Sequence, residues 1–212
     1  MIILFDLDGT LIDSTEAILE SFHNACRVHS FKNPKDEEIV SLIGHPLDYM
    51  FSSIGVEDDR VWDFVATYKE HYRAISTQKT QLLECANEAV LNASEFATLG
   101  IVTTKTGEYS KILMEHFGLM QYFKVLIGRE HVENPKPHPE PILKALEILE
   151  SIDEDVWMIG DTKLDLISAK NAGVESIAVL SGYDGIETLK QHSDIVLKDA
   201  SEAVKYIKSR KK

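Results

Sequence analysis

The sequence contains few cysteines, and their spacing excludes two common ways of stabilising a small fold. Only Cys26 and Cys85 occur among the 212 residues, and neither has a partner at Cys-x-x-Cys spacing. A zinc site built on cysteines needs such pairs, and a disulfide framework needs several cysteines at short intervals. We therefore expect two free thiols, without a zinc site or a disulfide framework.

Long apolar runs and an excess of basic residues are also missing. No apolar stretch reaches the length of a transmembrane helix, and Asp6 and Asp8 interrupt the N-terminal segment where a secretory signal would be apolar. The 22 Lys and Arg residues are outnumbered by 35 Asp and Glu residues, which gives a formal net charge of -13. Because nonspecific binding of nucleic acids or anionic membranes needs a basic surface, we expect neither partner and predict a cytoplasmic protein.

Five short apolar runs rich in Ile and Val predict buried strands. They lie at residues 2–5, 100–103, 125–127, 156–159 and 176–180, and a sixth run at 195–197 predicts an edge strand. The runs are continuous rather than alternating, and helical patterns separate most of them, for example at 109–117, 141–149 and 164–172. This pattern is typical of a parallel sheet covered by helices on both faces, so we predict a doubly wound, Rossmann-like α/β core.

The interval between the first two predicted strands is much longer than the roughly 30 residues that a βαβ unit needs. Within it, residues 14–80 have apolar side chains at helical spacing, and breaks at 33–34, 44–46 and 55 divide them into four helices. We predict that residues 14–80 form an all-helical cap, and that residues 1–13 and 81–212 form the α/β core. Ligands of such sheets bind beyond the carboxyl ends of the strands, so the cap would cover the site.

Chemically active side chains begin at the end of the first predicted strand. Asp6 and Asp8 are two positions apart, which sends both to the same side of an extended chain, and Gly9 lets the backbone turn sharply. An isolated pair of this kind is more often explained by helix capping, since short motifs recur by chance. The functional interpretation therefore depends on the other strand ends.

Three further strand ends supply complementary groups. Thr103 and Thr104 offer hydroxyl groups beside helix-opening N–H groups, which together can bind a phosphate oxygen. Lys136 lies between prolines that restrict its backbone, and Asp161 and Asp165 follow the fourth strand. Each feature alone has an ordinary explanation, such as β-propensity, a surface lysine or a helix cap. Gathered at one edge, the carboxylates would repel each other unless a cation intervened, and oxygen ligands without His or Cys favour Mg²⁺.

This order of motifs resembles the haloacid dehalogenase superfamily, specifically its phosphatase branch with a helical cap after the first strand. The resemblance extends over essentially the whole chain. The segments that carry it are Asp6-Leu7-Asp8-Gly9-Thr10 with the residues that follow to Ser14, Thr103-Thr104-Lys105, Lys136-Pro137-His138-Pro139, and Gly160-Asp161-Thr162 with Asp165.

The resemblance implies phosphoryl transfer in two steps. Asp6 would attack phosphorus and form an aspartyl phosphate, while Asp8 would act as general acid and then general base. Mg²⁺ would be held by the Asp6 carboxylate, the Asp8 carbonyl and Asp161. Asp165 would support the metal directly, through water or by orienting another ligand.

The resemblance also implies how the phosphoryl group is held. Thr103, Lys136 and the backbone N–H groups near Asp8, Gly9 and Thr104 would bind the phosphoryl oxygens.

The predicted substrate is a small phosphorylated metabolite. Residues 6–14 look like those of phosphoglycolate phosphatases and of their pyrophosphatase and nucleotidase relatives. Thr104 stands where Asn is more common, and residues 80–97 lack a frequent Pro-Gly turn, which weakens an assignment to phosphoglycolate itself. His45 is a candidate substrate contact in the cap, but an exposed histidine in an interhelical turn explains the same residue equally well. The oligomeric state is open between a monomer and a homodimer.

Three other functions are compatible with parts of the pattern. A β-phosphoglucomutase shares the catalytic groups and differs mainly in how its cap excludes water. A receiver-like switch would accept a phosphoryl group on Asp6 without turnover, although Asp8 and the inserted segment disfavour this interpretation. A non-catalytic scaffold is disfavoured because every expected catalytic residue is present.

Overall fold

The centre of the fold is a parallel sheet in the order β5-β4-β1-β6-β7-β8. The computed structural model describes residues 1–151 and 154–210. The sheet strands in this part of the chain are β1 (Ile2–Phe5), β4 (Thr98–Val102), β5 (Phe123–Ile127), β6 (Val156–Gly160), β7 (Glu175–Val179) and β8 (Val196–Leu197). Every neighbouring pair is parallel, so the predicted doubly wound α/β fold is confirmed.

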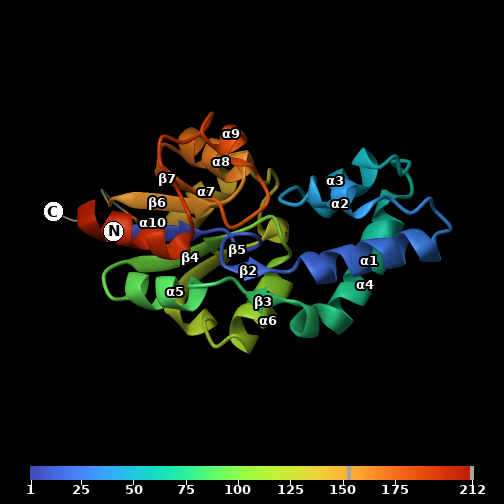
Figure 1. The fold of residues 1–212 in the computed structure, drawn as a ribbon, viewed down its shortest axis with the longest axis horizontal. Coiled ribbons are helices and arrows are strands. Elements are labelled where there is room, and N and C mark those ends of the chain that lie inside the picture. Colours follow the sequence, from blue (N-terminus) through green and yellow to red (C-terminus); the bar gives the residue numbers. More distant parts are fainter. Residues whose placement is uncertain (152–153, 211–212) are drawn as a thin grey trace.

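Helices cover both faces of the sheet because neighbouring residues of its strands point to opposite sides. Ile3 and Phe5 of β1 belong to the same apolar cluster as buried residues of three helices on one face, whereas Ile2 and Leu4 pack with two helices on the other. The first face carries α5 (Ala86–Ser94), α6 (Gly107–His116) and α10 (Ala200–Arg210). The second carries α7 (Glu140–Ile148) and α8 (Lys163–Ala172), with the short α9 (Ile186–Leu189) beside α8 (Figure 1).

Residues 14–80 are helical, as the sequence predicts. They contain α1 (Thr15–Val28), α2 (Asp36–Val40), α3 (Leu47–Ser53) and α4 (Val61–Lys79), which gather beyond one end of the sheet (Figure 1). These helices have an apolar cluster of their own, in which the Phe22 and Phe51 rings stack with centroids 4.1 Å apart. The division into a cap and a core at these boundaries stays a prediction.

A short antiparallel ribbon joins the segments that enter and leave these helices. It consists of β2 (Ile12–Asp13) and β3 (Gln81–Leu82), in which Ile12 pairs with Leu82. The sequence analysis does not predict this ribbon, since two residues per strand give no periodic signal. Two 3₁₀ helices flank β5, at η1 (Met120–Tyr122) and η2 (Arg129–His131).

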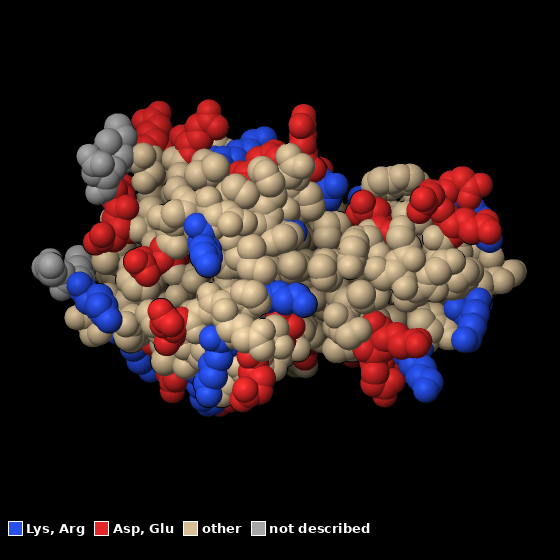
Figure 2. Space-filling model, turned by 90° about the horizontal axis from the view of Figure 1, so that it is seen from above, with Lys and Arg blue, Asp and Glu red and all other residues tan. Residues whose placement is uncertain are grey.

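Two properties of the folded chain bear on its possible partners: the apolar character of its helices and the distribution of its charged side chains. Among the described residues, none of the helices combines the length and apolar character that crossing a bilayer requires. On the face shown in Figure 2, the Lys and Arg side chains of the described residues are scattered among Asp and Glu and form no continuous patch.

Candidate active site

The carboxyl ends of β1, β4 and β6 lie side by side because β1 pairs with both of the other strands. These ends are followed by Asp6, Thr103 and Asp161, all of which are buried. The chain leaves β1 in one direction to reach β4 and β5, and returns to reach β6, β7 and β8 on the other side. The residues therefore meet where the strand order reverses, which is where doubly wound sheets bind ligands.

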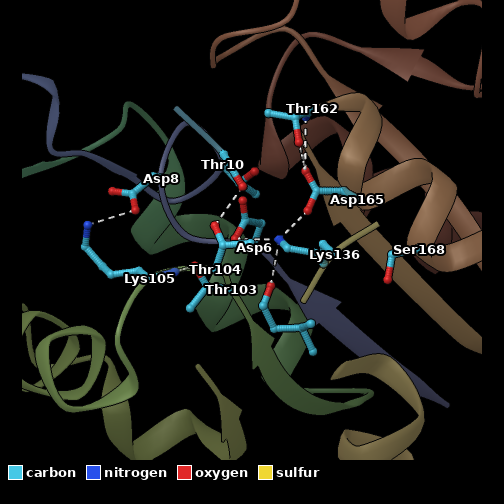
Figure 3. A network of polar contacts seen from close by, with 12 residues as sticks. Asp6, Asp8, Thr10, Thr103, Thr104, Lys105, Lys136, Thr162, Asp165 and Ser168 are labelled. Atoms are coloured by element: carbon cyan, nitrogen blue, oxygen red, sulfur yellow. Dashed lines mark hydrogen bonds and ion pairs between the residues drawn. The ribbon is translucent and has the colours of Figure 1, made fainter. Parts of the chain in front are cut away.

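Lys136 is buried between two carboxylates in this layer. Its side chain is 2% exposed, and its Nζ lies 3.0 Å from Oδ1 of Asp6 and 2.5 Å from Oδ1 of Asp165. Its ammonium group also donates a hydrogen bond of 3.1 Å to the carbonyl oxygen of Val102. Burial alone would lower the pKa of Lys136, but the ion pairs with Asp165 and Asp6 outweigh it and raise the pKa above its ordinary value. Lys136 is therefore a fixed positive charge beside Asp6 (Figure 3).

The carboxylates of this layer carry more negative charge than one lysine balances. Burial raises the pKa of Asp6 to about 6, although the nearby Lys136 opposes the shift. Burial and the neighbouring charges of Asp165 and Asp6 hold the pKa of Asp161 well above its usual range. One carboxylate oxygen from each of these three aspartates lies within 4.8 Å of the others. A bound cation would relieve this repulsion.

Asp161 is held by groups from two distant loops. The Thr10 hydroxyl donates a hydrogen bond of 2.9 Å to Oδ1, and the Tyr183 N–H donates one of 2.9 Å to Oδ2. Gly9 makes room for this contact, since its φ is +82° and a Cβ atom there would lie 2.3 Å from Oδ2 of Asp161. The Gly9 N–H itself donates to the Ile12 carbonyl oxygen, so Gly9 contributes its conformation and not a free donor.

Asp165 connects the site to the first turn of α8. The N–H and hydroxyl groups of Thr162 donate hydrogen bonds of 3.1 and 2.8 Å to its Oδ2, which caps the helix, while Oδ1 contacts Lys136. Both oxygens therefore have partners within the chain. A direct role in metal binding stays a prediction, and the structure adds a second role, the orientation of Lys136.

Asp8 faces away from this carboxylate cluster. Its Oδ2 forms an ion pair of 2.9 Å with Lys105, and its Oδ1 accepts a hydrogen bond from the Ser14 hydroxyl. The Lys105 ammonium also lies over the Tyr72 ring of α4, 4.7 Å from its centroid. Figure 3 shows Asp8 and Lys105 on one side of Asp6, with Lys136 and Asp165 on the other. The Asp8 carboxylate oxygens are thus held by Lys105 and Ser14, and metal binding by the Asp8 carbonyl stays a prediction.

The two threonines after β4 have different environments. Thr103 is buried, and its Oγ1 accepts a hydrogen bond of 3.2 Å from the Lys105 N–H. Thr104 turns its hydroxyl toward the helical segment and donates a hydrogen bond of 2.8 Å to the Gly44 carbonyl oxygen. The Thr104 hydroxyl is thus occupied between the two parts of the fold, which leaves its backbone for the predicted contact with phosphate.

His45 has its contacts outside the cluster of Asp6, Asp161 and Asp165. Its ring stacks on Tyr49 with centroids 4.3 Å apart, and burial lowers its pKa. A cavity lies beside Asp8, between the α/β core and the helices of residues 14–80. Gly44, the residue before His45, lines this cavity, but His45 itself does not. A contact between His45 and the substrate stays a prediction.

The sequence alone assigns no contact with the acids to several residues that build the site. Thr10 and Ser14 lie in the segment after the first predicted strand, and Lys105 lies just after the second. Because these segments also carry the acids or lie beside them, the sequence motifs already indicate that the three residues are near the acids. Tyr183 lies in the loop after β7, and its backbone N–H carries no sequence signal. The rule that ligands bind beyond strand ends points to that loop, but not to the donor within it.

Comparison with known proteins identifies relatives over nearly the full chain. The family model for haloacid dehalogenase-like hydrolases matches residues 3–179. Pyrophosphatase PpaX of Halalkalibacterium halodurans is 35% identical over 198 residues, which cover 92% of this chain and 91% of that protein. Pyrophosphatase PpaX of Bacillus cereus is 33% identical over 192 residues, which cover 89% of this chain and 88% of that protein.

Solved structures share the same arrangement of elements. A haloacid dehalogenase-like hydrolase from Streptococcus pneumoniae superposes with a TM-score of 0.87 at 26% identity, covering 97% of both chains. A predicted phosphatase from Clostridium acetobutylicum gives a TM-score of 0.89 at 25% identity and covers 98% of both chains.

Proposed function

This chain belongs to the haloacid dehalogenase-like hydrolase family, and on that basis we propose that it is a Mg²⁺-dependent phosphatase of a small phosphomonoester, acting through an aspartyl phosphate. The observation that carries the proposal is the position of Asp6, buried at the end of β1 against the cation of Lys136. A carboxylate attacks an anionic phosphate only where positive charge offsets their repulsion. Lys136 provides part of that charge.

The residues present fit a hard divalent cation. Asp6, Asp161 and the Asp8 carbonyl would hold Mg²⁺, since oxygen ligands suit this ion and the raised pKa values of Asp6 and Asp161 indicate uncompensated negative charge. Bound there, the ion would neutralise charge on the phosphoryl oxygens and orient them toward Asp6. The prediction of Mg²⁺ thus rests on the donor set and its electrostatics.

The first proposed step joins Asp6 to phosphorus. A carboxylate oxygen of Asp6 forms the new bond as the bond between phosphorus and the leaving oxygen breaks, and protonated Asp8 donates its proton to that oxygen. Lys136 and the Thr103 hydroxyl bind phosphoryl oxygens. Lys105 and Ser14 hold the Asp8 carboxyl group in place.

The second step releases phosphate. Asp8, now ionised, accepts a proton from a water molecule whose oxygen attacks phosphorus, and the bond to Asp6 breaks. Asp6 is then a free carboxylate and Asp8 is protonated, so both residues have returned to their starting state.

A second candidate substrate is inorganic pyrophosphate, which the names of the two pyrophosphatase relatives favour. The same residues would serve, with phosphate in place of an alcohol as the leaving group. The mutase, the phosphoacceptor switch and the scaffold are compatible with the same geometry. They differ in whether the phosphoryl group is transferred to a sugar, retained on Asp6 or never accepted.

The decisive experiment measures phosphate release from small phosphomonoesters and pyrophosphate, with Mg²⁺ or with excess chelator. Wild-type protein is compared with Asp6→Asn and with Asp58→Asn, a matched change at an exposed aspartate of the α3–α4 loop. Metal-dependent release that Asp6→Asn abolishes and Asp58→Asn keeps is the expected result.

The other outcomes select among the alternatives. A stable phosphoryl group on Asp6 after treatment with an acyl phosphate, without turnover, would favour the switch, and interconversion of sugar phosphates would favour the mutase. Absence of both turnover and phosphorylation would favour the scaffold. The cytoplasmic location and the choice between monomer and homodimer stay predictions.

A further inference from the structure

A cavity of about 240 Å³ opens beside the proposed general acid. Asp8, Thr104 and Lys105 line it from the α/β core, and residues of α1, α3 and α4 line it from the opposite side. Because Asp8 must reach the leaving oxygen, the leaving group of any substrate lies on this side of Asp6. The cavity is therefore where the leaving group is bound.

The wall of this cavity that faces Asp8 is mainly apolar. Three of the four helices of residues 14–80 contribute to it with Ile18, Leu47, Met50, Trp62, Val65 and Tyr68. Trp62 borders the cavity and is 63% exposed, so it adds an aromatic surface to the rim. Tyr72 also lines the cavity, with its ring 4.7 Å from the Lys105 ammonium.

Charged groups in the lining are largely committed to other contacts. Lys105 is paired with Asp8, and Glu130 accepts hydrogen bonds from the N–H groups that open α6. Arg129 donates a hydrogen bond of 3.1 Å to the carbonyl oxygen of Val132 and keeps its charge. The charges of Arg129 and Lys69 are matched in number by those of Glu130 and Asp48 in the same lining. The cavity is thus poorly suited to a second phosphate, which would lose its hydration against apolar walls.

We propose that the substrate is an organic phosphomonoester whose leaving alcohol carries an apolar body of about the size of an aromatic ring. The inference deepens the proposed phosphatase function and rests on it. Such a ring buries its surface against Leu47 and Trp62, whereas glycolate or inorganic phosphate leaves most of the cavity wall uncovered. This leaving group differs from the one that the names of the two pyrophosphatase relatives suggest.

The test compares phosphate esters of two alcohols with similar acidity, so that the intrinsic reactivity of the leaving group stays nearly constant. At saturating Mg²⁺, kcat/KM for 2-phenylethyl phosphate is compared with that for ethyl phosphate, and phosphoglycolate and pyrophosphate are measured beside them. We expect 2-phenylethyl phosphate to be preferred over ethyl phosphate by roughly 30-fold, because the ring adds apolar surface that becomes buried in the complex. The product alcohol, 2-phenylethanol, should inhibit ethyl phosphate hydrolysis competitively.

Substitutions in the cavity wall test which residues produce the preference for 2-phenylethyl phosphate. Leu47→Ala and Trp62→Ala should each reduce the ratio of kcat/KM between the two esters about tenfold. Val28→Ala is the matched control, because Val28 is an exposed apolar residue of α1 that does not line the cavity. The inhibition by 2-phenylethanol needs no variant, so it tests the proposal even where a substitution impairs folding.

The measurements distinguish a wrong leaving group from a wrong phosphatase function. Equal or better hydrolysis of ethyl phosphate, phosphoglycolate or pyrophosphate, without inhibition by 2-phenylethanol, would overturn the proposed leaving group and leave the phosphatase function standing. Absence of Mg²⁺-dependent release from every compound would overturn the phosphatase function and this inference with it.

Discussion

The Thr104 hydroxyl donates a hydrogen bond of 2.8 Å to the Gly44 carbonyl oxygen, and this contact joins the loop after β4 to the turn between α2 and α3. Gly44 has a φ of +104°, a conformation that side chains other than glycine rarely adopt. The hydrogen bond links the α/β core to the helical segment beside the cavity. We predict that Thr104 influences substrate binding through the position of this segment.

Thr104→Val should loosen this connection. The β-branched shape is kept while the donor is lost, and a single hydrogen bond contributes on the order of 1 kcal/mol. We expect KM to rise up to about tenfold with little change in kcat, and Thr104→Ser to retain the wild-type KM. Steady-state kinetics with one ester that the wild type hydrolyses measure KM and kcat for both variants. An unchanged KM in the valine variant would show that the bond does not control cap position.

Lys105→Met should impair proton transfer by Asp8. Methionine keeps the apolar stem over Tyr72 but removes the ion pair, so only Ser14 still orients the Asp8 carboxyl group. We expect kcat to fall on the order of tenfold or more with alkyl phosphates, whose leaving oxygen needs a proton. The loss should be much smaller with 4-nitrophenyl phosphate, because nitrophenolate leaves without protonation.

The comparison of the two esters separates this role from a general structural defect. Equal losses on alkyl and nitrophenyl phosphates would contradict the assignment of Lys105 as a positioning residue for Asp8. Partial recovery of kcat in Lys105→Arg would support it.

Much of the fold could be predicted because its signals are local. The buried strands are continuous apolar runs, and the parallel sheet follows from the helices between them. The position of Asp6, Thr103 and Asp161 in one layer then follows from topology alone, since parallel strands present their carboxyl ends at one edge. Lys136 is buried in the same layer, and its contact with phosphate stays a prediction.

The remaining features depend on contacts between distant segments. Strand alternation predicts Asp6 and Asp8 on the same side, but it does not predict the ion pair between Asp8 and Lys105, which comes from the loop after β4. The Tyr183 N–H reaches Asp161 only because the loop after β7 folds back over β1. No periodicity encodes such pairings, because each partner is an ordinary loop residue until the sheet has formed.

Asp6→Asn should abolish turnover and stabilise the metal-free protein at neutral pH. Burial raises the pKa of Asp6 from 3.8 to about 6, so the folded state binds this proton more tightly than the unfolded state. Stability is therefore greatest when Asp6 is protonated, decreases as pH rises from about 4 to about 6, and stays reduced above that range. Asparagine carries no charge at any of these pH values, so the penalty disappears.

Thermal unfolding in excess chelator measures this effect. The variant should exceed the wild type on the order of 1–3 kcal/mol near pH 7.5, and the gain should shrink toward pH 4. Asp58→Asn serves as the control, because Asp58 is exposed. A gain independent of pH would show that the charge of Asp6 does not limit the stability of the apoprotein.

Mg²⁺ and protons should compete for the same carboxylates. The pKa values of Asp6 and Asp161 are both raised, chiefly by burial, so at low pH the cation must displace protons before it binds. We expect the Mg²⁺ affinity to be nearly constant well above pH 6 and to fall at least about tenfold per pH unit below it. Calorimetric titration of the metal-free protein with MgCl₂ measures this dependence, and buffers of different ionisation enthalpy count the protons released. Asp161→Asn should weaken binding at every pH, whereas an affinity that stays constant between about pH 5 and 7.5 would place the metal on groups other than these two aspartates.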